Sequence, residues 1–193
     1  HWDETDGVAD LFVDTLRGET MIDVGAHTGT ALAPFLDRGW RIFGFEPDHK
    51  NRAKLLDRLA SHANCSRVNV DTRCVGKESK QKVPFYSSSQ STGISGLSAF
   101  HASHIESQTV DIVSLSDFFA DREMPKVDFL KIDTEGHDLF VLQGFPWNRT
   151  RPAVIECEFE DAKTLALGYT FADLADYLVS LQYTVFVSEW HPI

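Results

Sequence analysis

The sequence lacks long apolar runs and contains few cysteines. No stretch approaches the ~18 consecutive apolar residues of a membrane-spanning helix, and no signal-peptide pattern opens the chain. Its only cysteines are Cys65, Cys74 and Cys157, and no two of them form a CxxC pair. An odd number of scattered thiols argues against a disulfide framework or a zinc site. We therefore expect a cytoplasmic protein with reduced thiols and no membrane span.

Positive charge is also scarce. The chain carries 18 Lys and Arg residues against 29 Asp and Glu residues, which gives a formal net charge of −11. Binding of a nucleic-acid backbone requires a basic face, and an anionic membrane surface attracts the same kind of face. The composition therefore disfavours both as partners.

Short apolar strands alternate with amphipathic helices along the chain. Helices are predicted between the strands, with Asp48 and Thr170 as the N-caps of two of them. The repeated strand–helix order predicts a doubly wound, mostly parallel α/β sheet. The strands are predicted in the stretches TMIDVG, RIFGFEPD, SRVNVDTRCVG, KVDFLKIDTEG, RPAVIECEFE and YTVFVSEW.

This alternation is interrupted at about residues 77–112. KVPFY and TVDIVSL read as strands, but SSSQSTGISGLSAFHASH between them is small, polar and rich in serine. A long irregular stretch within a compact domain is usually functional or disordered. We interpret 77–112 as an insertion that forms a mobile flap near the mouth of an active site.

A glycine turn follows the first predicted strand. Gly25 and Gly29 enclose Ala26, His27 and Thr28, and Glu46 ends the next strand about twenty residues later. In a doubly wound sheet, ligands bind beyond the carboxyl ends of the strands, where an acid can accept both hydroxyls of a ribose. The arrangement predicts a cofactor of the adenosine type.

The details of the turn distinguish between such cofactors. The turn has no third glycine for a pyrophosphate and no lysine for a phosphate loop. Asp23 beside it suits a cationic ligand, and S-adenosylmethionine has a ribose, a sulfonium and no phosphate. In the alternative interpretation, the glycines only make a tight turn and Glu46 caps the following helix.

Four stretches resemble a known family in order and spacing. MIDVGAHTGT, IFGFEPD, VDFLKIDTEGHDLFVLQGF and PAVIECEFE are similar to the FkbM family of S-adenosylmethionine-dependent methyltransferases, over about residues 20–160. The signature from Lys131 to Gly136 is the most specific part. The family often has asparagine at the position of His27, so this chain departs from the pattern there.

The resemblance implies a Rossmann-like class I methyltransferase fold and S-adenosylmethionine as the cofactor. It implies transfer of a methyl group to a hydroxyl of a sugar, glycan precursor or polyketide-like metabolite. It also places the turn under the methionine part, the ribose at Glu46 and the adenine near Thr72. The full set of expected cofactor residues is Asp23, Gly25, Ala26, His27, Thr28, Gly29, Glu46, Pro47, Thr72 and Asp133.

One methyltransferase domain is expected over residues 1–193. The chain starts with His1 and ends near SEWHPI, before the seventh, antiparallel strand of the usual methyltransferase sheet. We therefore expect this chain to lack the seventh strand and to be a fragment or a domain of a longer chain.

Acidic residues follow the fourth and fifth main strands. Asp133 and Glu135 lie where the methyl group of the cofactor should point in this fold, and Glu158 ends the next strand. A carboxylate there can take the proton of an alcohol acceptor. Asp133 could instead be the N-cap of the helix that follows it. Glu158 is expected to line the acceptor pocket, unless it lies on the surface.

Histidines of the flap are further candidates for the general base. His101 and His104 lie three residues apart in the serine-rich segment, and histidine titrates near neutrality. His104 is the stronger candidate, although a histidine in a polar loop is most often only solvated.

No metal site is predicted. Asp133, Glu135, Glu158 and His137 could in principle gather a divalent cation, but their spacing matches no ligand template. Two other functions remain open: a nicotinamide-dependent oxidoreductase, and a non-catalytic module that binds a partner.

Overall fold

The computed structural model describes residues 4–12, 16, 19–88 and 95–188. The chain divides into two compact units, His1–Glu158 and Phe159–Ile193, and each is described by itself. The prediction of one domain over residues 1–193 stays a prediction. Among the described residues, none of the helices combines the length and the apolar character required to cross a membrane.

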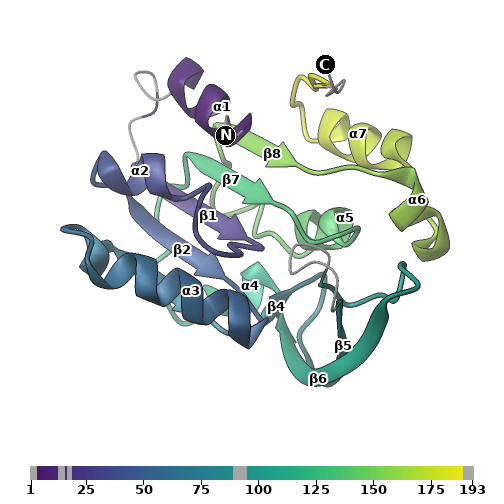
Figure 1. The fold of residues 1–193 in the computed structure, drawn as a ribbon. Helices are drawn as coiled ribbons and strands as arrows, with labels where there is room; N and C mark the ends of the chain where they lie inside the picture. The colour runs from purple at the N-terminus through teal and green to yellow at the C-terminus, as the bar shows by residue number, and fades with distance from the viewer. Residues whose placement is uncertain (1–3, 13–15, 17–18, 89–94, 189–193) are drawn as a thin grey trace, which may run out of the picture. The chain divides into compact units, whose positions relative to one another are not determined.

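A five-stranded parallel sheet forms the centre of the first unit (Figure 1). Its strand order is β3-β2-β1-β7-β8, so that β1 lies between β2 and β7, and all four pairings are parallel. The strands are β1 (Thr20–Val24), β2 (Arg41–Phe45), β3 (Val68–Asp71), β7 (Phe129–Ile132) and β8 (Val154–Cys157). The predicted doubly wound, mostly parallel sheet is confirmed, and its switch point lies between β1 and β7.

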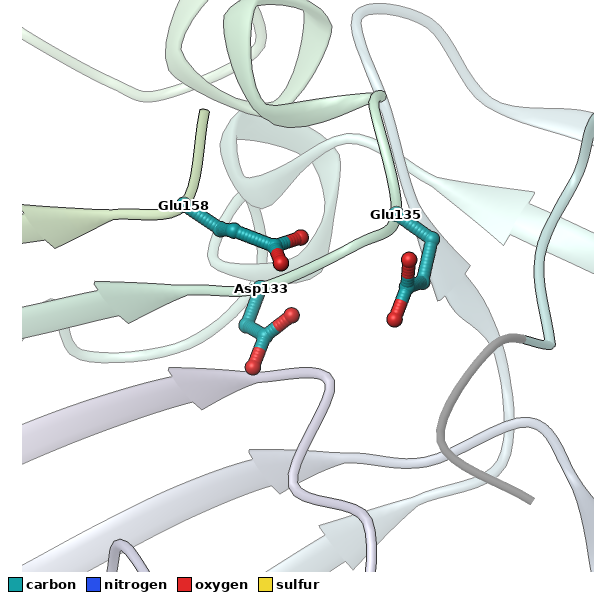
Figure 2. A group of neighbouring side chains, drawn as sticks. All are labelled: Asp133, Glu135 and Glu158. Carbon is teal, nitrogen blue, oxygen red and sulfur yellow. The ribbon is translucent and has the colours of Figure 1, made fainter. Parts of the chain in front are cut away.

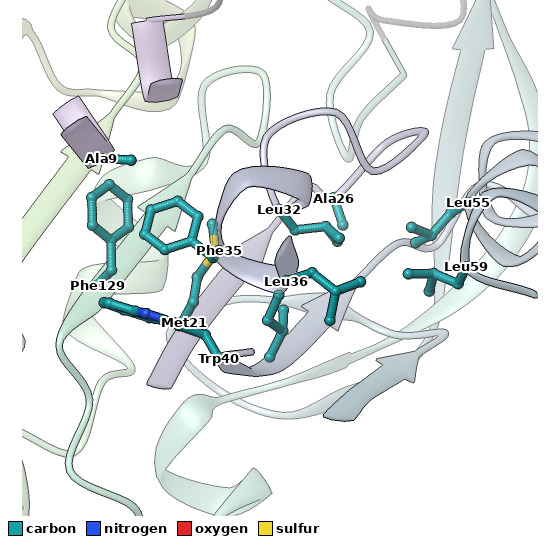
Figure 3. Packing of buried hydrophobic residues seen from close by; sticks show 11 residues of the cluster. Ala9, Met21, Ala26, Leu32, Phe35, Leu36, Trp40, Leu55, Leu59 and Phe129 are labelled. Atoms are coloured by element: carbon teal, nitrogen blue, oxygen red, sulfur yellow. The ribbon is translucent and has the colours of Figure 1, made fainter. Parts of the chain in front are cut away.

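One face of this sheet is covered by α1 (Glu4–Phe12), α2 (Ala33–Asp37) and α3 (His49–Ala60). Figure 3 shows the cluster of buried side chains there, with Met21 and Phe129 of the sheet beside Phe35 and Trp40. The ring of Phe35 lies 4.7 Å from that of Phe129 and 5.0 Å from that of Trp40. These contacts fix α2 on the sheet.

The N-cap of α3 is the one that the sequence predicts. Asp48 accepts hydrogen bonds from the backbone N–H groups of Lys50 and Asn51, and α3 begins at the next residue. The short α2 has Pro34 in its first turn.

The opposite face carries a second aromatic cluster. Phe43 and Phe45 of β2 pack edge-to-face on Phe118, and Phe43 also contacts Phe119. Phe118 ends the short α4 (Leu115–Phe118), whose N-cap Ser114 accepts from the N–H of Asp117. Both faces of the sheet are therefore covered, as a parallel sheet requires.

The predicted flap region contains a second sheet. Strands β4 (Cys74–Val75), β5 (Lys80–Ser88) and β6 (His104–Val113) form it in the order β4-β6-β5, with β5 and β6 antiparallel. Part of the flap, residues 89–94, lies outside the described residues. The mobility of the flap stays a prediction.

The third predicted strand is split between the two sheets. Val68–Asp71 pairs with β2, whereas Cys74–Val75 pairs with β6, and two residues separate the strands. Asp71 accepts a hydrogen bond from the backbone N–H of Arg73 and two from its guanidinium group. This local turn ends β3, so the prediction of one continuous strand was wrong.

The second unit contains α6 (Asp161–Thr164), a 3₁₀ turn (Leu165–Leu167) and α7 (Phe171–Ser180). Thr170 caps α7 through a capping box with Asp173, as predicted. Residues 183–188, the described part of the predicted sixth strand, form no strand, so that prediction is not confirmed there. Phe186 is 86% exposed. Alternating apolar residues form a strand only where a neighbouring strand pairs with them.

Candidate active site

The turn after β1 is built against the end of β7. Gly25 donates its N–H to the carbonyl of Phe45 at 3.0 Å, and Asp133 donates its N–H to the carbonyl of Val24 at 2.9 Å. Gly25 has a φ of +84°, and a Cβ atom on it would overlap the carbonyl oxygen of Asp133. Glycine is therefore required at this position by the protein's own backbone.

Neighbouring atoms of the protein also explain why the second position of the turn is a glycine. Gly29 has a φ of +79°, and a Cβ atom there would meet the side chain of Leu55 in α3. His27, between the two glycines, also has a positive φ, of 48°. The tight-turn interpretation of both glycines thus has direct structural support, whether or not a ligand contacts the turn.

Glu46, the residue after β2, ties this turn to the start of α3. One carboxylate oxygen accepts the N–H of His27 at 2.7 Å, and the other accepts the N–H of Asp48 at 2.8 Å. The side chain is buried. Burial raises the pKa of Glu46 to about 8, although the two backbone hydrogen bonds lower it in part.

A cavity of about 380 Å³ opens at the carboxyl ends of β1, β2, β7 and β8. This volume lies within the range of small-molecule sites. Its lining includes six acidic side chains and, apart from histidine, two basic ones: Glu4, Glu46, Asp133, Glu135, Glu156 and Glu158, with Arg73 and Lys131. A cationic ligand therefore suits the cavity better than an anionic one.

Most of the predicted site residues line this cavity. Among the predicted cofactor residues, six do so: Gly25, Ala26, His27, Glu46, Pro47 and Asp133. Four are not part of the lining: Asp23, Thr28, Gly29 and Thr72. Thr72 is exposed, and Arg73, Cys74 and Val75 after it form the wall instead.

Three of the four predicted catalytic residues are brought together. Figure 2 shows Asp133, Glu135 and Glu158 beyond the ends of β7 and β8, and one carboxylate oxygen from each residue lies within 4.8 Å of those from the other two. The N–H of Glu158 donates to the carbonyl of Ile132 at 3.1 Å, which holds Glu158 beside Asp133. A cluster of acids alone does not define a metal site, so the absence of a metal stays a prediction.

The fourth predicted catalytic residue lies elsewhere. His104 begins β6, and its ring lies 4.6 Å from that of Phe100. Neither His104 nor His101 lines the cavity. The structure does not bring these histidines to the three carboxylates.

Asp133 is not the cap of the following helix. The helix α5 (Asp138–Gln143) begins five residues later, with His137 as its N-cap residue. The intervening turn holds Glu135 at a φ of 56° and Gly136 at a φ of 99°. The predicted alternative for Asp133 is therefore wrong, and its side chain, 44% exposed, faces the cavity.

A buried charged row crosses the sheet next to the cavity. Asp23, Lys131 and Glu156 are register partners on adjacent strands, so their side chains share one face. The ammonium of Lys131 lies 3.8 Å from Asp23 and 3.3 Å from Asp133, and Thr5 of α1 donates to Glu156 at 2.6 Å. Burial lowers the pKa of Lys131, but Asp23, Asp133 and Glu156 raise it further, well above its ordinary value.

Sequence reasoning missed several lining residues. Glu4 and Thr5 come from α1, where the apolar spacing indicates a helix but not what it covers. Lys131 lies within the otherwise apolar strand FLKI, and the register shows which acids of the neighbouring strands lie beside it. Asn51 and Phe85 carried no sequence signal for the site.

Comparison with known proteins gives one family. Residues 23–185 match the methyltransferase FkbM domain. The chain belongs to the FkbM methyltransferase family. No curated protein matches it.

Two solved structures are similar to this FkbM domain. A methyltransferase FkbM from Methylobacillus flagellatus KT is 20% identical, with a TM-score of 0.53, over 83% of this chain and 36% of that one. It supports the fold alone. The glycopeptide N-methyltransferase MtfA is 25% identical over 37% of this chain and 33% of that one, with a TM-score of 0.32. The chain thus spans about a third of the length of either protein.

The start of α5 in this FkbM domain carries a buried titratable group, Asp138, next to a half-buried one, His137. Asp138 is 1% exposed; one of its oxygens accepts from Thr134 at 2.9 Å, and Oδ1 has no hydrogen-bond partner among the described residues. Burial, with the charges of Asp133 and Glu158, raises the pKa of Asp138 to about 8. Burial lowers the pKa of His137 to about 4, so its ring is neutral at pH 7.

We expect Gly25→Ala to destabilise the domain much more than Gly39→Ala. Both glycines have a φ near +80°, but a Cβ atom on Gly39 meets nothing within 4 Å. The left-handed backbone should cost Gly39→Ala ~1 kcal/mol, and the added overlap should bring Gly25→Ala to ~3 kcal/mol. Urea unfolding measures both values. Equal losses would show that the contact with Asp133 is not a constraint.

We expect the stability of the FkbM domain to fall between about pH 4 and pH 8 because of Asp138. A carboxyl whose folded pKa is raised stabilises the fold below its unfolded pKa, and this contribution is lost as the pH rises through the folded pKa. Asp138→Asn should reduce that fall by ~1–3 kcal/mol. Urea unfolding at pH 5 and pH 8 measures it, with Asp121→Asn on the surface as the control. If the free energy of unfolding fell by the same amount between pH 5 and pH 8 in Asp138→Asn as in wild type, burial of Asp138 would not be the cause.

Proposed function

We propose that the chain is an S-adenosylmethionine-dependent O-methyltransferase. Glu46 is the observation that carries the proposal: a buried carboxylate at the end of β2, in the cavity wall, held by two backbone N–H groups. Each of its oxygens has a further lone pair that can accept from a hydroxyl of a ribose.

The cavity lining is consistent with the other parts of this cofactor. The excess of acidic over basic lining side chains, six against two, favours a ligand with a sulfonium and an ammonium group. Ala26 and the glycine turn would lie under the methionine part. Arg73, Cys74 and Val75 replace Thr72 as the proposed adenine wall.

The reaction would use residues beyond the ends of β7 and β8. The bound cofactor would supply a methyl group on a sulfonium: attack of the acceptor oxygen on the methyl carbon breaks the S–C bond, and the neutral thioether S-adenosylhomocysteine leaves. Asp133 would accept the proton of the acceptor hydroxyl, while Glu135 and Glu158 would hold the acceptor through hydrogen bonds. Apolar lining residues such as Phe45 and Ile132 would exclude water.

The acceptor class that we propose is a hydroxyl of a sugar, glycan precursor or polyketide-like metabolite. The acidic lining favours neutral or cationic acceptors over phosphorylated ones. The three cysteines are free and fit the reducing cytoplasm as the compartment.

Calorimetry with S-adenosylhomocysteine, the demethylated product, tests the cofactor. We expect wild type to bind it, and Glu46→Gln to weaken binding roughly 10–100-fold, because the amide offers the ribose only one acceptor oxygen. Glu123→Gln, on the surface, is the matched control. Binding of NAD instead would support an oxidoreductase, and binding of neither would support a partner-binding module.

Asp133→Asn should separate catalysis from cofactor binding. We expect transfer of labelled methyl groups from S-adenosylmethionine into a metabolite extract to fall ~100-fold or more, since a general base contributes about that much. Affinity for S-adenosylhomocysteine should fall much less, by about tenfold at most, because the amide still offers Lys131 an acceptor oxygen. His104→Ala is the comparison, because His104 lies outside the cavity lining. A large loss for His104→Ala with none for Asp133→Asn would reverse the assignment of the base.

A further inference from the structure

The buried lysine of the cavity wall has more donors than the protein satisfies. Lys131 is 8% exposed and lines the cavity. Among the described residues its ammonium makes one hydrogen bond, to Asp133 at 3.3 Å, and it faces Asp23 at 3.8 Å. Charge-assisted hydrogen bonds are usually 2.7–2.9 Å long, and an ammonium group has three donors.

The position of this lysine is set by the strand register. Lys131 pairs with Asp23 of β1 and Glu156 of β8, and Gly25 follows β1 two residues after Asp23. The ammonium therefore lies next to the turn under which the methionine part of the cofactor would lie. Glu4 of α1 also lines the cavity, and Thr5 binds Glu156.

One end of the cavity thus combines a buried ammonium with several carboxylates. An α-amino acid carries the complementary pair, a carboxylate and an ammonium, on one carbon atom. Among the charged lining residues, Lys131 and Arg73 are the two cations, and Arg73 is held by Asp71 at 2.7 Å. The acid contacts of Lys131 are longer, at 3.3 Å to Asp133 and 3.8 Å to Asp23, so Lys131 is the cation with more donor capacity left for a ligand carboxylate.

We propose that Lys131 binds the α-carboxylate of the methyl donor, and that it thereby selects ligands that carry an amino-acid group over simple adenosine thioethers. The assignment rests on the proposed function, because it concerns the same cofactor. Lys131, the first residue of the family signature from Lys131 to Gly136, thereby has a binding role. Asp23 and Asp133 are the acids that hold its charged side chain in place.

Ligands that lack parts of the amino acid test this assignment by binding alone. S-Adenosylhomocysteine has the whole group, its decarboxylated analogue keeps only the ammonium, and 5′-methylthioadenosine lacks both. Lys131→Met should weaken S-adenosylhomocysteine ~10-fold or more, the size of a lost charge-assisted hydrogen bond, and leave 5′-methylthioadenosine within about twofold. The decarboxylated analogue should bind the variant at least as well as it binds wild type. Calorimetry measures all three ligands.

Two further variants keep the test decisive. Lys131→Arg should recover part of the selectivity, because it keeps the positive charge. Lys131→Met leaves Asp23 buried without its cation, so if it does not fold, the double variant Asp23→Asn, Lys131→Met removes both charges and should show the same selective loss. Lys126→Met is the matched control: Lys126 lies 3.3 Å from Asp128 and does not line the cavity.

The outcomes separate the two proposals. Equal weakening of all three ligands, or of none, overturns the role of Lys131 and leaves the methyltransferase proposal standing. A wild-type protein that binds neither S-adenosylhomocysteine nor 5′-methylthioadenosine overturns the proposed function itself.

Discussion

The arrangement of the site depends on a buried ion cluster in the middle of the parallel sheet. Lys131 of β7 lies between Asp23 of β1 and Asp133, which follows β7. Asp23 is fully buried, and a buried carboxylate is costly unless a cation compensates it. The same sheet face carries Met21 and Phe129 two residues earlier, in the apolar core. On this face, apolar side chains are thus followed two residues later by charged ones. The cavity begins at these charged side chains.

The loops around the cavity are held by hydrogen bonds that continue the sheet beyond its strands. Glu46 donates its N–H to Asp71, Asp133 to Val24, and Glu158 to Ile132. Each acid therefore leaves the sheet in a fixed register with its neighbour. The carboxylate of Glu46 adds two more bonds, from His27 and Asp48. Such a site is ordered before a ligand arrives, which reduces the entropy cost of binding.

The sequence predicted those features of the fold that depend on residues close together in the chain. The caps Asp48 and Thr170 and the parallel sheet follow from patterns within a few residues. The positions of Asp133 and Glu158 followed from the rule that sites lie beyond the carboxyl ends of strands. What failed depends on distant partners. The pairing of Cys74–Val75 with β6, the contribution of α1 and the overlap that Gly25 avoids each involve residues far along the chain, which a single sequence does not connect.

The second sheet is formed by one continuous excursion of the chain. The backbone leaves the parallel sheet after β3, passes through β4, β5 and β6, and returns through α4 to β7 (Figure 1). Ser95, Gly96 and Leu97, from the connection between β5 and β6, reach the cavity wall. Insertions and deletions in that connection can therefore reshape the cavity wall while every pairing of the parallel sheet stays intact. Evolution, or a protein engineer, can change which ligands fit the cavity at this connection without redesigning the scaffold.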